Sequence, residues 1–352
     1  MKNVSQDQSP AISIVVLNYN GARWIERCLA SIREQTIFSR LEVIVADNLS
    51  TDGSDKLAEQ LIKDWPHGKF IQHGANLGYT QGNNVAAQQA SGEFLFILNN
   101  DAWLEKDCLE ILLRVTREQN AGASCPLVMN FDDNTFQSLG IAGFDVFGLS
   151  STRRQFADTR EIFMPEGCSW LVERKLFEAL GGFDPEFFMY SDEYEFSFRL
   201  WISGRKAIAV PAARLHHRGA ANVNPVGGAQ VVEFRTSDTK RFYANRNGLL
   251  VILKNAQHVL LLLAVLQTGL LLLEALAALV LVRRWSFIQR AYLKAFRDVW
   301  RLRHHVCGER KKIRAFRRRS DWWMLRFLRW RPNRLEEVLQ VWRKGPPNVT
   351  PG

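Results

Sequence analysis

The chain has 352 residues, of which 47% are hydrophobic and 23% charged, enough to bury one large domain with an appendage or two domains. Its net charge of +10 is uneven, because residues 283–344 hold 20 Lys or Arg against 5 Asp or Glu and the remainder is about five charges negative. Residues 1–10 are polar and contain no apolar run, so we expect a disordered start and exclude a signal peptide there. Five scattered cysteines without metal-ligand spacing indicate reduced thiols in a cytoplasmic protein rather than a disulfide framework.

The amino-terminal half alternates apolar runs with helical patterns. We predict strands at residues 12–17, 41–46, 70–71 and 94–98, and helices around residues 25–32, 55–63 and 80–90. This alternation is typical of βαβ units. The predicted fold class is therefore α/β, with a mainly parallel sheet and helices on both faces.

Polar residues collect where these strands end, and right-handed crossovers bring such ends to one edge of the sheet. They are Asn18, Tyr19, Asn20, Asp47, Asn48, Asn76, Gly78, Asn99, Asn100 and Asp101. Ligands of open α/β sheets bind at this edge. Asp101 could hold a divalent cation against a diphosphate or cap a helix with its body at residues 104–115. Asp47 could accept hydrogen bonds from a nucleoside or belong to a turn, and residues 76–78 could bind phosphate or form an ordinary loop.

Two common nucleotide motifs are missing from the sequence. No G-x-G-x-x-G follows the first strand and no G-x-x-x-x-G-K-[ST] occurs, so dinucleotide and P-loop proteins lose their main support.

Three carboxylates lie close together in the second half, at Asp192, Glu193 and Glu195. At helical spacing Asp192 and Glu195 share a face and Glu193 points elsewhere. The cluster is either a solvated helix start or a site, and the flanking aromatic residues favour a site. A carboxylate in apolar surroundings can take a proton from a sugar hydroxyl. Trp170 could stack on an acceptor sugar or belong to the core.

Residues 259–282 are apolar except for Gln267, Thr268 and Glu274, and would be long enough to span a bilayer. A single span would place the body and the basic tail on opposite sides of the membrane, and Glu274 adds to the cost of insertion. We therefore favour a re-entrant or interfacial helix over a span.

The basic tail contains many tryptophans, a composition that suits an anionic membrane surface but also single-stranded RNA. They are Trp285, Trp300, Trp322, Trp323, Trp330 and Trp342. The adjacent apolar run favours lipid over nucleic acid.

Several motifs together resemble the ordered signature of the family 2 glycosyltransferases. They are residues 15–20 (VVLNYN), Asp47-Asn48 with Ser50 and residues 52–54 (DGS), Asn76 with Gly78-Tyr79, residues 98–101 (LNND), residues 181–199 (GGFD through DEYEFSFR), and residues 216–219 (HHRG) with Tyr243 and residues 246–247 (RN). The resemblance covers roughly residues 11–250 and implies the GT-A fold, a nucleotide-sugar-binding, Rossmann-like sandwich.

The resemblance also implies roles for individual residues. Asp101 would be the ligand of Mg²⁺ or Mn²⁺, with His216 near the metal or the diphosphate, and Asn99 stands where the family motif often has a first Asp. Glu193 falls on the catalytic base, with Asp192 as its rival because the order of Glu and Asp is swapped here. The implied donor-binding residues are Asn18, Asn20, Asp47, Asn48, Asp52, Asn76, Gly78, Asn100, Arg199 and His216. The implied acceptor-binding residues are Trp170, Tyr190 and Glu195.

We predict a disordered start at 1–10, a catalytic domain at 11–250, a membrane-associated apolar helix at 251–282 and a basic helical tail at 283–352. The expected activity is metal-dependent, inverting transfer from a nucleoside-diphosphate sugar, such as dTDP-rhamnose or another UDP or dTDP sugar, to a lipid-linked or cell-surface glycan. The segments look like those of rhamnosyltransferases, and the expected place is the cytoplasmic face of a bacterial-type inner membrane. Two alternatives stay open, a processive polysaccharide synthase, although no Gln-x-x-Arg-Trp occurs, and a non-catalytic membrane- or nucleic-acid-binding protein on a degenerate GT-A body.

Overall fold

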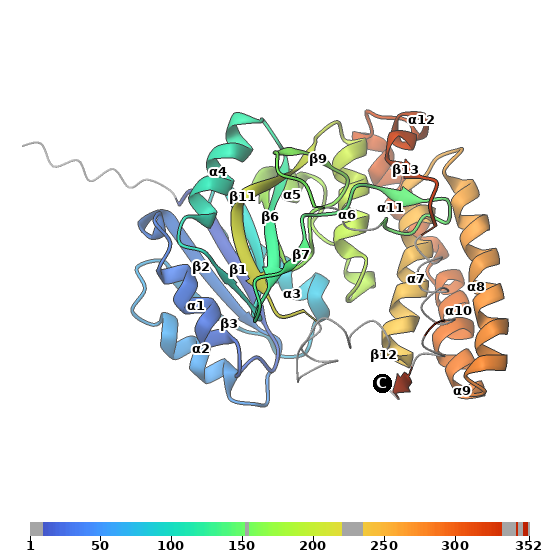
Figure 1. The fold of residues 1–352 in the computed structure, drawn as a ribbon, viewed down its shortest axis with the longest axis horizontal. Coiled ribbons are helices and arrows are strands. Elements are labelled where there is room, and N and C mark those ends of the chain that lie inside the picture. Colours follow the sequence, from blue (N-terminus) through green and yellow to red (C-terminus); the bar gives the residue numbers. More distant parts are fainter. Residues whose placement is uncertain (1–9, 152–154, 220–234, 333–342, 344–347, 351–352) are drawn as a thin grey trace, which may run out of the picture.

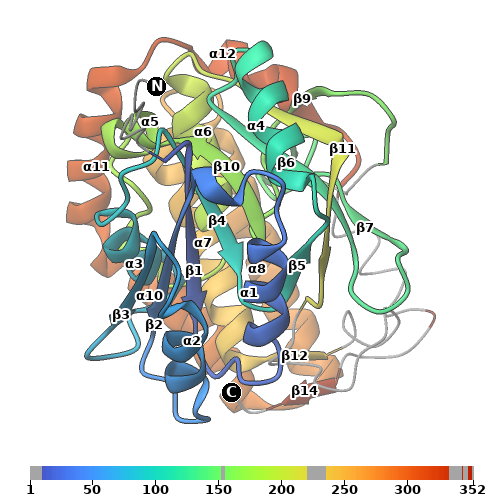
Figure 2. The ribbon, with the colours of Figure 1, turned by 90° about the vertical axis from the view of Figure 1, so that its left-hand side faces the viewer.

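A computed structural model describes residues 10–151, 155–219, 235–332, 343 and 348–350. Most of the predicted disordered start and Trp342 of the tail lie outside the described residues. The described part forms a twisted mixed sheet between helices, with a further layer of helices beside it, as Figures 1 and 2 show from two sides.

The amino-terminal half has the predicted βαβ order. Its elements are β1 (Ile12–Asn18), α1 (Ile25–Arg33), η1 (Phe38–Arg40), β2 (Leu41–Asp47), α2 (Ser54–Ile62), β3 (Gly68–Gln72), α3 (Gly78–Ala87) and β4 (Phe94–Asn99). The four strands pair in parallel in the order β3-β2-β1-β4. Strands β1, β2 and β4 are buried on both faces up to their last residues, as expected for apolar runs inside a parallel sheet.

The second half of the sheet is mixed. Its elements are β5 (Ala102–Leu104), α4 (Cys108–Glu118), β6 (Ala123–Asn130), β7 (Phe136–Ser138), β8 (Phe144–Asp145), β9 (Arg160–Ile162), β10 (Ser169–Glu173), α5 (Arg174–Ala179), η2 (Pro185–Phe187), α6 (Asp192–Ile202) and β11 (Ala207–His217). The full order is β3-β2-β1-β4-β10-β6-β11-β5, with β7 beside β6 and β9 beside β11. Strand β10 runs antiparallel to β4, which ends the parallel half of the sheet.

One predicted helix begins later than expected. The helix body predicted from residue 104 starts at Cys108, because Leu104 pairs with Leu215 as the end of the short strand β5. The amide of Glu105 also donates to the carbonyl of Arg214, which extends the pairing. Asp101 therefore precedes a strand and does not cap a helix.

The remaining helices form a layer on one side of the sheet. They are α7 (Asp238–Asn255), α8 (Leu261–Leu281), α9 (Trp285–Ile288), the π-helix η4 (Gln289–Leu293), α10 (Lys294–Arg301), α11 (Arg303–Phe316), α12 (Asp321–Met324) and η5 (Leu325–Phe327); the short strands β12 (Arg235–Ser237), β13 (Leu328–Arg329) and β14 (Asn348–Thr350) complete the described elements. In Figure 1, α7, α8, α10 and α11 lie on the side of the molecule opposite α1 and α2. The domain boundary predicted after residue 250 is wrong, since it falls within the continuous helix α7, where Leu250 and Val251 are both buried.

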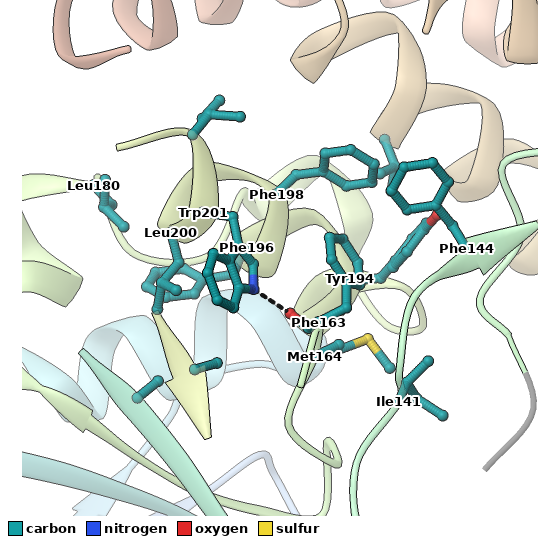
Figure 3. Packing of buried hydrophobic residues seen from close by; sticks show 14 of the residues in the cluster. Ile141, Phe144, Phe163, Met164, Leu180, Tyr194, Phe196, Phe198, Leu200 and Trp201 are labelled. Atoms are coloured by element: carbon teal, nitrogen blue, oxygen red, sulfur yellow. Dashed lines mark hydrogen bonds between the residues drawn. The ribbon is translucent and has the colours of Figure 1, made fainter. Parts of the chain in front are cut away.

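Two apolar cores hold these layers together. Helices α1, α2 and α4 cover one face of the sheet, and α3, α5 and α6 cover the other. Figure 3 shows the aromatic part of the second core, where Phe144, Phe163, Phe198 and Trp201 pack together. The buried indole of Trp201 donates a hydrogen bond of 2.8 Å to the carbonyl of Phe163, which satisfies its one polar atom. Helix α6, which carries the carboxylate cluster, is therefore fixed between the sheet and the outer helical layer.

Candidate active site

The strand ends meet at one edge of the sheet, as predicted. In the parallel register Asn18 lies opposite Asp47, and Leu17 lies opposite Asn99. The side-chain amide of Asn18, which is fully buried, donates to Asp47 over 2.7 Å, and its oxygen accepts from Asn100 over 2.8 Å. One buried side chain thus connects the ends of β1, β2 and β4.

Asp47 is the most heavily hydrogen-bonded carboxylate of this edge. It accepts from Asn18, from the amide and hydroxyl of Ser50, and from Gln72 over 2.9 Å. Burial raises the pKa of Asp47, but these hydrogen bonds outweigh burial and lower the pKa below its ordinary value. The charged carboxylate therefore fixes the loop that follows β2, and this loop forms one wall of the edge.

Asn20 and Asp52 brace the loops after β1 and β2 against each other. Asn20 has a φ of 50°, and its side-chain oxygen accepts from the amide of Thr51 over 2.8 Å. Asp52 accepts from the amide of Ala22 over 2.9 Å and from the hydroxyl of Ser54. Both predicted donor-binding residues thus use their polar atoms to shape the loops.

Asn48, Asn76 and Gly78 lie at the start of α3. The amide of Gly78 donates to the side chain of Asn76 over 2.9 Å, and Asn48 donates to the carbonyl of Gly78 over 3.0 Å. Gly78 has a φ of +73° and approaches Phe188 so closely that a Cβ would lie 2.5 Å from that ring. His73 also belongs to this group, because its Nδ1 lies 2.8 Å from the oxygen of Asn48. No motif or spacing in the sequence pointed to His73, a single histidine after a short strand.

Asp101 has a histidine beside it, but not the predicted one. The Nε2 atom of His217 lies 3.3 Å from Oδ1 of Asp101. His216 instead stacks on Trp103, with ring centroids 3.7 Å apart, and its Nε2 lies 3.3 Å from Glu105. Successive residues of a strand point to opposite faces, so only one of the two histidines can face Asp101. The structure therefore places His217 beside Asp101, and not His216, which was the histidine predicted for the metal and the donor.

Charge favours an interaction between Asp101 and His217. Burial lowers the pKa of His217, but Cys168 and Asp101 raise it well above its ordinary value. Burial raises the pKa of Asp101, whereas His217 and Arg218 lower it below its ordinary value. The structure thus places an ionised carboxylate next to an imidazole at the carboxyl end of β4.

This pair of ligands fits a divalent cation that shares its coordination sphere with a substrate. Among the described residues no group of three or more His, Cys, Asp or Glu side chains is arranged to hold a metal. Mg²⁺ is commonly held by one or two carboxylates together with substrate phosphates, and carboxylates also suit Mn²⁺. Asp101 with His217 therefore suits a metal that binds together with a diphosphate rather than a closed structural site.

The carboxylates of α6 divide as the helical spacing predicted. Asp192 is buried, with 4% of its surface exposed, while Glu193 is only half-buried. Burial, and then the charge of Glu193, raise the pKa of Asp192 well above its ordinary value, which favours its protonated form. Glu193 is the more accessible of the two carboxylates.

The loop before α6 is held in an unusual conformation. Phe188, Tyr190 and Ser191 have φ angles of 61°, 66° and 62°, which cost energy for side chains other than glycine. The amide of Asn247 donates to the carbonyls of residues 187, 189 and 190, and Arg246 donates to those of residues 186 and 187. This clamp gives Arg246 and Asn247, noted in the sequence only as part of the family resemblance, a definite structural role. It fixes the direction in which α6 begins.

Two consecutive residues, Gly167 and Cys168, lie next to Glu193 of α6 and next to the Asp101–His217 pair. At Gly167, a Cβ would lie 2.9 Å from Oε1 of Glu193, so the Glu193 side chain lies directly against this glycine. The next residue, Cys168, accepts from the amide of Asn99 over 2.9 Å and interacts with His217. Glu193 and the Asp101–His217 pair are therefore both next to one short segment, residues 167–168.

Three predicted site residues lie elsewhere. Trp170 has 1% of its surface exposed and packs among Phe183 and Phe196, so it belongs to the core and offers no face to a sugar. Glu195 and Arg199 form a buried ion pair of 2.5 Å, with 1% and 3% exposure. Their predicted roles at the acceptor and the donor are wrong in this structure. Tyr190, at 38% exposure, remains accessible beside the site.

One cavity is separate from these residues. It measures about 620 Å³, lies between α1 and β5, and is lined in part by Arg27, Trp103 and Glu105. None of the residues predicted for catalysis, donor, acceptor or metal lines it.

The comparisons with known proteins agree with this geometry. Residues 13–181 match the family model described as glycosyl transferase family 2. The chain is 29% identical over 237 residues to the N-acetylglucosaminyl-diphospho-decaprenol L-rhamnosyltransferase of Mycobacterium tuberculosis, covering 59% of this chain and 76% of that protein. It is 32% identical over 126 residues to the putative glycosyltransferase EpsH of Bacillus subtilis, covering 36% of each chain, so it spans only about a third of that relative.

A solved structure supports the fold. The mannosyltransferase PcManGT from Pyrobaculum calidifontis, solved with GDP-Man and Mn²⁺, superposes with a TM-score of 0.53 at 20% identity, covering 83% of this chain and 88% of the other. At that identity the likeness shows the fold alone, and the predicted GT-A class is confirmed.

Proposed function

The chain is a family 2 glycosyltransferase, with its family domain at residues 13–181, and we propose that it transfers a sugar from a nucleoside-diphosphate sugar to an acceptor hydroxyl. The observation that carries the proposal is the arrangement around Gly167 and Cys168. An accessible carboxylate, Glu193, lies against Gly167, and His217, which faces Asp101 at the end of β4, interacts with the next residue, Cys168. Sugar transfer to a hydroxyl uses a group of each kind, a proton acceptor and a site for the diphosphate.

The donor would bind along the strand ends. We assign its pocket to Asn18, Asn20, Asp47, Asn48, Asp52, Asn76, Gly78 and Asn100. The mannosyltransferase neighbour was solved with GDP-Man and Mn²⁺, and the mycobacterial relative is a rhamnosyltransferase. These relatives support a sugar nucleotide in general, and the second favours dTDP-rhamnose or another UDP or dTDP sugar.

A divalent cation, Mg²⁺ or Mn²⁺, would be held by Asp101 and His217. When bound, it would supply positive charge against the developing negative charge of the departing diphosphate. The chain's own contribution is a pair of ligands positioned by neighbouring strands, in which Ala102 of β5 lies opposite His217 of β11.

Glu193 would act as the general base. Its carboxylate takes the proton of the acceptor hydroxyl while that oxygen forms a bond to the anomeric carbon, and the bond from this carbon to the diphosphate breaks. Attack from the face opposite the leaving diphosphate inverts the anomeric centre. Burial and the charge of Glu193 raise the pKa of Asp192 and favour its protonated form, so we assign Asp192 to shaping the base position.

The acceptor would be a glycan attached to a lipid or to the cell surface. Support comes from the mycobacterial relative, whose name specifies a decaprenol-linked acceptor. Tyr190, exposed beside the start of α6, is positioned to contact such an acceptor. A lipid-linked acceptor and a cytoplasmic sugar nucleotide together place the reaction at the cytoplasmic face of a bacterial-type inner membrane.

The deciding experiment measures release of nucleoside diphosphate from a panel of UDP, GDP and dTDP sugars, with Mg²⁺, with Mn²⁺ and with a chelator. We expect metal-dependent hydrolysis of one donor class, reduced in Glu193→Gln and Asp101→Asn. Absence of both hydrolysis and metal-dependent nucleotide binding for every donor would overturn the proposal and favour a non-catalytic protein.

A further inference from the structure

Helix α8 presents an apolar face that no described residue covers. This outer face of α8 consists of Leu262, Val265, Leu266, Leu272, Leu273, Leu276, Leu279, Val280 and Leu281, each between 42% and 69% exposed. Within the described residues α8 is the one helix long and apolar enough to cross a membrane, and its 21 residues extend over about 31 Å. Exposed apolar surface of this extent is unusual for a monomer in water and marks an interaction site.

The opposite face of α8 packs against the protein. Leu263, Ala264, Gln267 and Leu271 are buried, at the 3–4 spacing of one helical stripe. Leu263 and Ala264 join the core of the catalytic body, and Leu271 packs with Leu249 of α7. Glu274, the one acidic residue of α8, points toward this protein side, where its carboxylate lies 3.8 Å from Arg241 of α7. The helix is thus divided into a protein face and an apolar outer face.

The chain that precedes α8 is bonded to the chain that follows it. The buried carboxylate of Asp321, in α12, accepts from the amides of Gln257, His258 and Leu260 over 2.9, 2.7 and 3.2 Å. Arg310 of α11 donates to the carbonyls of Leu253 and Ala256 at the carboxyl end of α7. These contacts fix the amino end of α8 against helices that come after it.

The middle of α7 is held in the same way. Arg246 of α7 pairs with Asp298 of α10 over 3.0 Å, and Asn245 donates to the carbonyl of Ala291 over 3.0 Å. Helices η4, α10 and α11 therefore return along α7, and Figure 1 shows them beside it. If α8 crossed a bilayer, the chain before it and the chain after it would lie on opposite sides, and all these contacts would be lost.

The residues around the outer face carry positive charge. Residues 261–301 contain six Lys or Arg and two carboxylates, and the carboxylates are the ones paired with Arg241 and Arg246. Arg283 and Arg284 follow α8 directly and are exposed, as are Trp285 and Trp300 at 54% and 70%. Leucines bordered by arginine and tryptophan match a bilayer surface with anionic headgroups.

We propose that α8 lies parallel to an anionic membrane surface, with its outer face among the acyl chains, and does not cross the bilayer. The protein would then attach from one side only, with its catalytic body and its basic helices in the same compartment. This inference concerns attachment and does not rest on the proposed sugar transfer, because membrane binding can be measured without donor or acceptor.

Flotation of the purified full-length chain with vesicles tests the proposal. We expect binding to vesicles of phosphatidylcholine with phosphatidylglycerol, weaker binding to phosphatidylcholine alone, and a loss of affinity of at least about tenfold in the combined variant Leu262→Gln, Leu273→Gln, Leu276→Gln. Leu49→Gln is the matched control, since Leu49 is 49% exposed but lies in the loop after β2, outside this face. Arg283→Gln with Arg284→Gln should weaken binding to anionic vesicles and reduce its salt dependence.

Protease digestion distinguishes attachment from spanning. In sealed inverted membrane vesicles of cells that produce the chain, protease should remove both the catalytic body and the tail, whereas a protected tail would establish a span and overturn the proposal. Concentration-dependent dimerisation that the leucine variant abolishes, without any change in vesicle binding, would overturn it in favour of a second copy as the occupant. Circular dichroism of each variant confirms that it is folded.

Discussion

The segment from residue 184 to residue 195 contains two kinds of buried carboxylate. Asp192 is buried without a cation beside it, and burial raises its pKa well above the ordinary value. Glu195, three residues further on, is buried as deeply, but Arg199 and Lys254 outweigh the effect of burial and lower its pKa. Burial alone therefore does not set the direction of the pKa shift; between these two carboxylates, the neighbouring cations make the difference.

The compensating cations come from distant parts of the chain. Lys254 of α7 is fully buried, lies 3.1 Å from Glu195, and pairs with Asp184. His305 of α11 lies 2.8 Å from the same oxygen of Asp184. The network thus connects the helix that carries the candidate base with the outer helical layer. Asp192 and the more accessible Glu193 lie at the start of this same helix, α6.

The largest effect that this comparison predicts is at Glu193. Glu193→Gln removes the proton acceptor and should lower the rate of transfer by about 10²–10⁴-fold, measured as kcat with saturating donor and acceptor. Asp192→Asn is the matched control, because burial raises the pKa of Asp192 and favours its neutral form, and the amide has nearly the same shape. The Asn variant should lose less than about tenfold.

The opposite result would contradict the assignment of Glu193 as the base. If Asp192→Asn abolished transfer while Glu193→Gln kept near-full turnover, the buried carboxylate would be the base. The greater accessibility of Glu193 would then not identify the catalytic carboxylate.

The next largest effect is predicted at Lys254, the buried cation shared by Asp184 and Glu195. Lys254→Met leaves Asp184 and Glu195 buried without their shared cation, and such losses cost about 3–5 kcal/mol of unfolding free energy. Denaturant unfolding of the purified chain measures the change. Lys312→Met is the control, since Lys312 is 75% exposed in its pair with Glu309 and its loss should cost less than about 1 kcal/mol. Equal midpoints for the wild type and Lys254→Met would show that the network does not stabilise the fold.

Asp101 is an intermediate case between these two kinds of carboxylate. One histidine, His217, faces it, and a bound metal would supply the remaining positive charge. Asp101→Asn and His217→Gln should each raise the Mn²⁺ concentration that gives half-maximal rate by about tenfold or more, because even indirect metal contacts contribute 10–100-fold. His216→Gln is the control, because His216 stacks on Trp103 and faces away from Asp101. Equal effects of His216→Gln and His217→Gln would show that facing Asp101 does not decide which histidine supports metal binding.

Only part of the site could be predicted from the sequence. Strand ends were predictable, because apolar runs such as residues 94–98 end in polar residues and parallel strands align their ends. The sequence could not decide whether His216 or His217 faces Asp101. That choice depends on the register of β11 against β5, two strands that are about a hundred residues apart. A shift of one residue exchanges the two faces of a strand.

The acceptor assignments of Trp170 and Glu195 were wrong for a related reason. Residue types and local spacing place Glu195 with Asp192 on one helix face, which the burial of both confirms. They do not reveal that Lys254, about sixty residues later, fills the space beside Glu195. Trp170 was recognised as a residue that suits either a sugar or a core, and the aromatic packing of Phe183 and Phe196 decided for the core.

The smallest predicted effect tests the compensated network by its pH dependence. The hydrogen bond to Asp184 raises the pKa of His305, burial and Lys254 oppose this, and Glu309 supports it. A raised pKa means that the protonated form stabilises the fold, fully below about pH 6.5 and less as pH rises through the folded value. The lowered pKa values of Asp184 and Glu195 act in the opposite direction, because their contribution is present above about pH 4.5 and is lost in acid.

His305→Gln should therefore destabilise the protein more at about pH 6 than at about pH 8, measured as unfolding free energy in denaturant. His304→Gln, on the exposed face of the same helix, is the control and should change stability little at either pH. The pairing of Lys254 with both carboxylates persists through this range, so the His305 effect should be smaller than that of Lys254→Met. An identical pH dependence of the wild type and His305→Gln would mean that His305 is not charged in the fold, and that Lys254 and Arg199 provide the compensation on their own.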